Sequence, residues 1–233
     1  GFSSGLPFFL TAATLGYWLR DEGTSLKAIG FIAWVGLAYS FKYLWAPVVD
    51  RVTLPGFGRL GRRRGWLLFT QILLGAGLLA MAMIGPGHGL VLLGAAALFV
   101  AVASATQDIA VDALRIEAAD DAEELGLFTS AFQLGYRVAV LASDAMILII
   151  AQQIGWNLSY VVMAGLMLIG ITATLLIKEP VAAERVMAAK KALWTPTGLF
   201  DAVIGPMWQF FKSYGLVGLV MLLMITLYRL PEF

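Results

Sequence analysis

Five ionisable side chains interrupt stretches of this sequence that are otherwise apolar: Lys42, Asp108, Asp112, Arg137 and Asp144. Placing one such charge at the centre of a helix in lipid costs about 2.5–3.5 kcal/mol. Side chains of this kind therefore face the interior of a helix bundle or water, and they commonly pair with a group of opposite charge. At these positions they bind charged solutes, carry protons, or pair for structural reasons alone.

One segment, SATQDIAVDALR, carries several of these polar groups on one helix face. Ser104, Asp108, Asp112 and Arg115 follow at spacings of four, four and three residues, with Gln107 beside them. A face of this kind predicts the wall of a cavity. Because burial favours the neutral form of a carboxyl group, Asp108 and Asp112 are candidate proton-coupling residues. The alternative for Asp112 is that it pairs with loop arginines and fixes the helix end.

The expected depth of each charged residue in the membrane distinguishes these residues further. At a rise of about 1.5 Å per residue, Asp108 lies about 27 Å into its expected helix and Lys42 about 20 Å into an earlier one. Arg137 follows about 16 Å into the next helix, close to the middle of the bilayer. Arg137 is therefore the charge that costs most, the expected counter-charge of Asp108, and a candidate contact for a solute carboxylate.

The composition is that of a helical membrane protein. Of the 233 residues, 60% are hydrophobic and 13% charged, and the mean hydropathy is +0.84, whereas soluble domains average about 25% charged residues. A net charge of +1 gives no reason to expect a nucleic-acid partner. With no cysteine, His88 as the only histidine and no nucleophile motif, we expect no enzyme, no metal site and no cofactor.

Apolar windows of about 20 residues predict six complete membrane spans and the start of a seventh. The expected spans cover residues 2–19, 28–49, 66–84, 90–115, 126–150, 158–177 and, for the seventh, 213–229. We therefore divide the chain into a six-helix bundle (1–177), a linker with an amphipathic surface helix at 182–194 (178–212), and the beginning of a seventh span (213–233). We expect the chain to be a piece of a longer protein.

The distribution of Lys and Arg predicts the orientation. Eleven of these residues flank or lie in the connections at 50–65, 117–125 and 178–212, against two in the connections on the other side. Since short cytoplasmic loops carry the excess of positive charge, we expect those three connections and the N-terminus to be cytoplasmic. The acidic run 117–125 is interpreted as a solvated connection between helices.

The connection at 50–65 combines a carboxylate and arginines at neighbouring helix ends. Its candidate residues are Asp50, Arg51, Arg62, Arg63 and Arg64. Ion pairs among them can hold two helix ends in one conformation and release them in another, which is the behaviour of a conformational latch. The alternative is a basic loop that only sets the topology.

Five segments together resemble the AmpG-type muropeptide permeases of the major facilitator superfamily. They are GFSSGLP (1–7), VGLAYSFKYLWAPVVDR (35–51), GRRRGWLLFTQILL (61–74), SATQDIAVDA (104–113) and GYR (135–137). The resemblance extends over nearly the whole chain in matching order. It implies an all-α membrane fold in which this chain supplies the first six-helix half of a transporter, and it implies that the second half is missing here.

The resemblance further implies proton-coupled import of anhydro-muropeptides (GlcNAc–anhydroMurNAc, with or without peptide) across the bacterial inner membrane for peptidoglycan recycling. In that role Asp108 and Asp112 would couple protons. Arg137, Lys42, Gln107 and Tyr136 would contact carboxylates and sugar hydroxyls. Two alternatives stay open: transport of another anion such as acetyl-CoA, and a structural or assembly subunit of a larger membrane complex.

Overall fold

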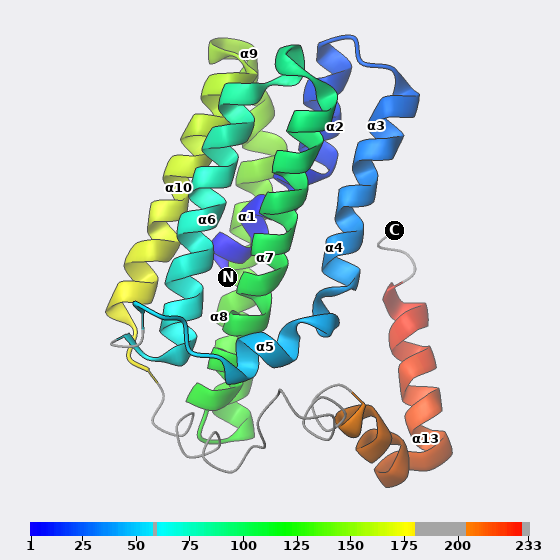
Figure 1. Cartoon of the computed structure of the whole chain (residues 1–233). Coiled ribbons are helices and arrows are strands. Elements are labelled where there is room, and N and C mark those ends of the chain that lie inside the picture. Colours follow the sequence, from blue (N-terminus) through cyan, green and yellow to red (C-terminus); the bar gives the residue numbers. More distant parts are fainter. Residues whose placement is uncertain (58–59, 180–203, 230–233) are drawn as a thin grey trace. The chain divides into compact units, whose positions relative to one another are not determined.

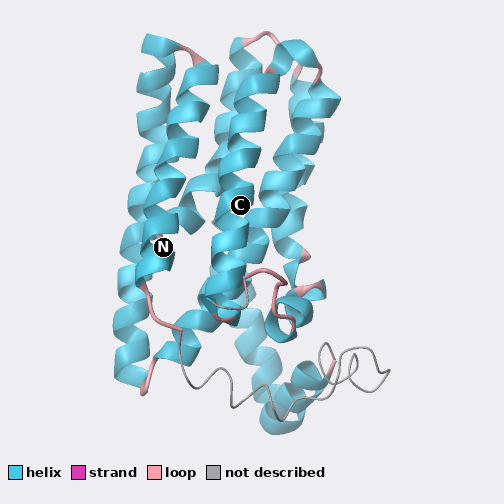
Figure 2. Ribbon diagram, turned by 60° about the vertical axis from the view of Figure 1, so that its left-hand side comes forward, coloured by secondary structure: helices cyan, strands magenta, loops and turns pink. Residues whose placement is uncertain are grey.

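The computed structural model describes residues 1–57, 60–179 and 204–229. The chain divides into two compact units, Gly1–Met187 and Ala188–Phe233. Every regular element among the described residues is a helix (Figures 1 and 2). The all-α fold expected from the composition is therefore confirmed.

Four continuous helices in the described residues are long and apolar enough to cross a membrane, and all four belong to the first unit. They are α6 (Arg62–Ile84), α7 (Leu90–Ala118), the continuous run Ala122–Ile154, and α10 (Trp156–Leu176). The run Ala122–Ile154 consists of α8 (Ala122–Val140), the π-helical η5 (Leu141–Met146) and α9 (Ile147–Ile154). A short turn, η4 (Pro86–His88), joins α6 to α7. These helices correspond to the third to sixth expected spans.

The first two expected spans are broken into shorter helices. Their pieces are α1 (Phe2–Thr11), α2 (Ala13–Asp21), α3 (Leu26–Ile32), η1 (Ala33–Gly36), α4 (Leu37–Ser40), η2 (Lys42–Leu44) and α5 (Ala46–Arg51). The first break falls at Ala12, whose backbone angles are φ −118° and ψ −102°. In the second span Pro47 has no N–H to donate to the preceding turn, and it lies in the first turn of α5, where that loss is tolerated.

Close packing of small residues holds the first unit together. α6 packs along α7 and α10, and α1 packs along α8. A Cβ atom on Gly77 would lie 2.6 Å from Cγ2 of Val100, and one on Gly5 would lie 2.7 Å from the carbonyl oxygen of Tyr136. Glycine at these positions lets the helix backbones approach closely. The apolar core between these helices includes the fully buried Leu74.

Hydroxyl groups compensate for the break in the first span. The Tyr160 hydroxyl of α10 donates to the carbonyl oxygen of Leu10 at 2.8 Å, just before the break. Thr14, just after it, donates to the carbonyl oxygen of Ser143 in η5 at 2.6 Å. Backbone groups freed by an irregular helix in lipid need such partners inside the protein. The break in α1 is thus part of the packing between the first span and its neighbours.

The acidic run after α7 is a helix cap. Asp121 precedes α8, and its Oδ1 accepts a hydrogen bond from the backbone N–H of Glu124 at 2.8 Å. Glu124 in turn accepts from the backbone N–H of Asp120 at 2.8 Å. The arrangement is similar to a capping box, except that the Glu124 carboxylate accepts from the residue before the N-cap Asp121. It starts α8 at Ala122, four residues earlier than the apolar pattern predicts.

In the second unit, α13 (Gly205–Arg229) contains a kink at Gly215, where φ is 50° and ψ is −131°. The helix begins before the expected start of the seventh span at Ser213. The expected surface helix 182–194 lies outside the described residues, as do Pro231 and Glu232. The division into bundle, linker and seventh span stays a prediction.

Removing the hydroxyl of Tyr160 tests how the broken first span is stabilised. Because Tyr160→Phe leaves the carbonyl of Leu10 without its side-chain donor, the free energy of unfolding should fall by about 1 kcal/mol. The measurement is denaturant unfolding in detergent, followed by circular dichroism. Tyr17→Phe is the matched control, because Tyr17 is 46% exposed and should tolerate the change. Equal stability of the two variants would contradict this interpretation.

Candidate functional site

An ion pair joins the second expected span to α7 inside the first unit. The Nζ atom of Lys42 lies 3.8 Å from Oδ2 of Asp108, and their side chains are 36% and 22% exposed. Lys42 comes from the irregular segment η2, and Asp108 from the middle of the apolar α7. The cation paired with Asp108 is therefore Lys42. The expectation that Arg137 supplies this counter-charge is wrong.

The neighbour of Asp108, Gln107, holds α1 against α7. Gln107 is fully buried, and its amide nitrogen donates to the hydroxyls of Ser3 at 3.2 Å and Ser4 at 3.1 Å. Both of its N–H groups therefore have protein partners. In this conformation Gln107 links helices and offers no donor to a solute.

Ser3 is also the meeting point of two further helices. The amide nitrogen of Gln71 on α6 lies 3.4 Å from the Ser3 hydroxyl, and the hydroxyl of Thr174 on α10 donates to Oε1 of Gln71 at 2.9 Å. A Cβ atom on Gly170 would lie 2.5 Å from Cβ of Ser3. α1, α6, α7 and α10 thus converge on one small, hydrogen-bonded junction.

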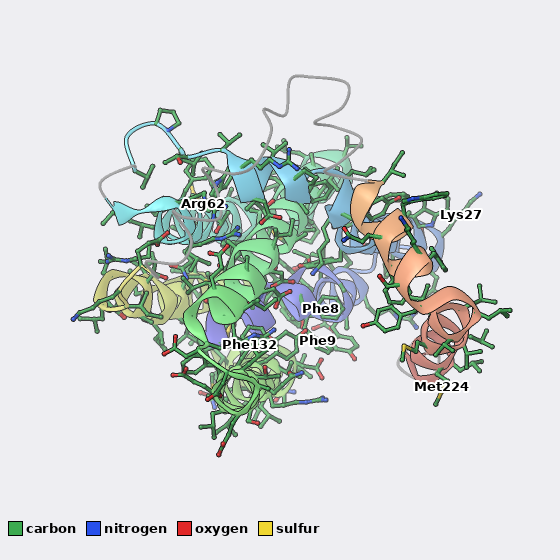
Figure 3. All side chains as sticks on the ribbon, turned by 90° about the horizontal axis from the view of Figure 1, so that it is seen from below. Phe8, Phe9, Lys27, Arg62, Phe132 and Met224 are labelled. Carbon is green, nitrogen blue, oxygen red and sulfur yellow. The ribbon has the colours of Figure 1, made fainter. Side chains whose placement is uncertain are left out.

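Asp112 has a local partner. Its Oδ1 lies 2.9 Å from Nη2 of Arg115, three residues later on α7. The guanidinium of Arg115 also lies over the ring of Phe132 on α8, 4.6 Å from the ring centroid. The carboxylate of α7 that Arg62 and Arg63 contact is Glu117. Figure 3 shows Phe132 on α8, viewed along the bundle.

Arg63, at the start of α6, is the centre of a cluster of ion pairs. Its side chain is 3% exposed. Its guanidinium binds Oδ1 of Asp50 at 2.7 Å and both carboxylate oxygens of Glu117, at 2.6 and 3.0 Å. Arg62, labelled in Figure 3, binds Glu117 at 3.2 Å and the backbone carbonyl of Asp50. The ends of α5, α6 and α7 are therefore held together by charge.

The same cluster reaches α10 through Glu179. The two carboxylate oxygens of Glu179 accept from the backbone N–H groups of Arg63 at 2.8 Å and Arg64 at 3.0 Å. These N–H groups lie in the first turn of α6, where a negative charge is stabilised. Gly61, with φ at +91°, allows the approach, because a Cβ atom there would lie 2.5 Å from Cδ of Glu179.

Arg64 completes the arginine cluster, by which we mean Asp50, Arg62, Arg63, Arg64, Glu117 and Glu179. Its side chain donates to the carbonyl oxygens of Thr174 at 3.1 Å and Leu175 at 2.8 Å, at the end of α10. Carbonyls in the last turn of a helix need such donors. Arg51 lies at the end of α5. The sequence pointed to Asp50 and the arginines, but it did not identify Glu117 or Glu179.

The remaining candidates lie on α8 and in η5. Arg137 is exposed and has no ion-pair partner among residues 1–57, 60–179 and 204–229. Tyr136 is half-buried, with its ring 6.2 Å from that of Phe132. Asp144 is half-buried in η5. The structure thus pairs Lys42 with Asp108 and places Gln107 against Ser3 and Ser4.

A cavity of about 390 Å³ lies among α1, α6, α7, α8 and α10. Ser3, Gln71, Arg115 and Thr174 contribute its polar groups, and the other lining residues are largely apolar. Lys42, Asp108 and Arg137 do not line it, so we do not assign the candidate site to this cavity. Within the described residues, no group of His, Asp or Glu side chains is arranged to hold a metal ion.

Truncating Glu117 tests the importance of the arginine cluster. Because Glu117→Ala would leave the buried guanidinium of Arg63 with only Asp50 as a partner, the free energy of unfolding should fall by about 3 kcal/mol. Chemical unfolding in detergent measures this change. The control is Glu123→Ala, which removes an exposed carboxylate from the first turn of α8. Unfolding at the same denaturant concentration in both variants would contradict the assignment.

Comparisons with known proteins agree with this architecture. The sequence pattern of the Major Facilitator Superfamily matches residues 1–231. The chain is 42% identical over 233 residues to the anhydromuropeptide permease of Escherichia coli K12, covering 100% of this chain and 44% of that protein. It is 36% identical over 234 residues to an uncharacterized protein of Haemophilus influenzae, covering 100% of this chain and 52% of that protein.

The chain spans about half the length of these two relatives. The family pattern covers the helices that carry both the Lys42–Asp108 pair and the arginine cluster. The predicted resemblance to AmpG-type permeases is confirmed by the similarity to the Escherichia coli protein. The chain belongs to the Major Facilitator Superfamily.

Proposed function

We propose that this chain forms the first half of a transporter that imports anhydro-muropeptides together with protons across the bacterial inner membrane. The solute is GlcNAc–anhydroMurNAc, with or without peptide. The similarity to a protein named anhydromuropeptide permease supports the solute class. The observation that carries the coupling is the Lys42–Asp108 pair within an apolar bundle, because charges are retained in lipid-embedded helices chiefly where they have a function.

The pair supplies a chemical basis for coupling. When Asp108 is ionised, its carboxylate attracts the ammonium group of Lys42. When Asp108 takes up a proton, this attraction is lost, and the ammonium of Lys42 becomes available to a carboxylate of the solute. Proton uptake and solute binding then favour each other, which is the requirement for symport.

Arg137 and Tyr136 on α8 are proposed as further solute contacts. The exposed Arg137 guanidinium is suited to a second carboxylate, and the Tyr136 hydroxyl is suited to a sugar hydroxyl. Gln107 contributes differently in the conformation seen here, since its amide donates to Ser3 and Ser4. Asp112, paired with Arg115, is a secondary proton-coupling candidate.

The arginine cluster is proposed as the latch that alternating access requires. It joins the ends of α5, α6, α7 and α10 by ion pairs and backbone hydrogen bonds. Such contacts are strong in one arrangement and are exchanged for others when the helix ends separate. The excess of Lys and Arg at this end supports a cytoplasmic location for the cluster and the N-terminus.

Solute accumulation driven by a pH gradient tests the proposal. The complete reading frame that encodes this chain is expressed, purified into vesicles and given labelled anhydro-muropeptide, with the membrane potential clamped to zero. If one proton accompanies each solute, a gradient of one pH unit supports about tenfold accumulation, since one unit corresponds to about 1.36 kcal/mol. Uptake that ignores the gradient, or no uptake, would refute symport and favour the alternative of a structural subunit.

Asp108→Asn tests the residue assigned to the proton. This variant keeps the size of the side chain and removes its titration. Accumulation should therefore stop when the solute concentrations inside and outside the vesicles are about equal, while binding of the solute persists. Asp120→Asn is the matched control, because Asp120 lies exposed in the connection between α7 and α8. If Asp108→Asn accumulated solute to the same ratio as Asp120→Asn, Asp108 would not be the coupling residue.

A further inference from the structure

Unpartnered polar atoms gather on one side of Asp108. In the described part of the chain, six buried side-chain atoms have no hydrogen-bond partner. They are Nε1 of Trp18, the hydroxyl of Tyr39, Oγ of Ser104, Oε1 of Gln107, Oδ1 of Asp108 and Nε of Arg115. Five of the six belong to Tyr39 on α4 and to the polar face of α7, so they are not scattered exceptions.

The two oxygens of Asp108 have different surroundings. Oδ2 faces the ammonium of Lys42 at 3.8 Å, whereas Oδ1 is buried without a partner. A buried acceptor left without a partner costs about 1–3 kcal/mol. Oδ1 is therefore the oxygen on which a proton, or a water molecule that delivers one, is best accommodated.

A series of hydroxyl groups leads to this oxygen. The Tyr39 hydroxyl on α4 and Oγ of Ser104 on α7 are both buried without a partner, and α4 packs against α7. Ser104 precedes Asp108 by four residues on α7, about 6 Å along the axis, towards the Leu90 end of the helix. The hydroxyls thus lie on the side of Asp108 that is remote from the arginine cluster, which contains Glu117 near the opposite end.

The position of Tyr39 is fixed by packing on both sides. Its ring makes an edge-to-face contact with Phe8 of α1 at 5.2 Å between centroids, and Figure 3 labels Phe8 on that helix. Two turns later, Trp45 donates from Nε1 to the hydroxyl of Thr106 on α7 at 3.0 Å. These contacts hold α4 and η2 against α7, so that Tyr39 faces the polar stripe.

We propose that Tyr39 and Ser104, with water molecules held between them and Oδ1 of Asp108, form the path by which protons reach Asp108 from the Leu90 end of α7. This proposal rests on the proposed function and names its proton route. Small polar sites of this kind, with several unpartnered donors and acceptors, are those that hold buried water.

The transfer needs no other reactant. Water and hydroxyl groups each accept one hydrogen bond and donate another, so a proton entering at one end releases a proton at the other. Only O–H bonds form and break, and one proton is added to Oδ1. The charged groups that act on Asp108 here are Lys42 from η2 and Asp112 from α7, and Tyr136 of α8 is the titratable group that acts on Tyr39 from another helix.

Two conservative variants test the path in the full-length transporter. Tyr39→Phe and Ser104→Ala remove one oxygen each from the proposed route. Uptake driven by a pH gradient should slow by about tenfold or more, as for loss of a positioned proton-transfer group. Exchange of labelled for unlabelled anhydro-muropeptide at equal pH needs no net proton movement, and it should keep its wild-type rate. Tyr43→Phe is the matched control, since Tyr43 is 57% exposed one turn after Tyr39.

The outcomes separate the path from the function on which it rests. Slowed gradient-driven uptake with unchanged exchange, and a larger slowing in deuterated water than in the wild type, would support the path. If uptake and exchange fell together, or if both variants behaved like Tyr43→Phe while the wild type accumulated solute, the path would be wrong and symport would stand. If the wild type showed no gradient-driven accumulation, symport and the path would both be refuted.

Discussion

The ion pair between Lys42 and Asp108 is the interaction on which the functional interpretation depends. A single charge on α7 would be costly in lipid, and the cation that pairs with it comes from the irregular second span. Its short helices and 3₁₀ segments replace one continuous helix between Leu26 and Arg51. Two of these short elements, α4 and η2, pack against α7, and they carry Tyr39 and Lys42. The second span therefore supplies the partner of Asp108.

Two polar regions of the first unit are physically connected. At Ser3, the side chains of Gln71 and Gln107 meet, and Thr174 binds Gln71. The carbonyl of the same Thr174 accepts from Arg64, which adjoins the N–H groups capped by Glu179. Hydrogen bonds thus run from the residue beside Asp108 to the arginine cluster. A movement of α10 relative to α6 would therefore strain both regions at once.

Much of this arrangement was predictable from the sequence, but the contacts between segments that are far apart in the sequence were not. The stripe on α7 and the combination of Asp50 with loop arginines follow from helical spacing and from charge next to helix ends. The ion pairs of Glu117 could not be predicted, because this residue belongs to an acidic run that is typical of a solvated connection. The contacts of Glu179 could not be predicted either, because this residue lies in the expected linker. The predicted partner of Asp108 was also wrong. The expected depths along straight helices favoured Arg137, and the sequence does not show that the second span, which carries Lys42, is irregular.

Infrared difference spectroscopy of the full-length protein in lipid tests the central claim most directly, because it observes the protonation of a carboxyl group itself. Spectra are recorded before and after addition of anhydro-muropeptide, for the wild type and for Asp108→Asn. The account predicts that solute binding produces the C=O stretching band of a protonated carboxyl group in the wild type, and that this band is absent in Asp108→Asn. The same band in both proteins, or no such band in the wild type, would contradict the role assigned to Asp108.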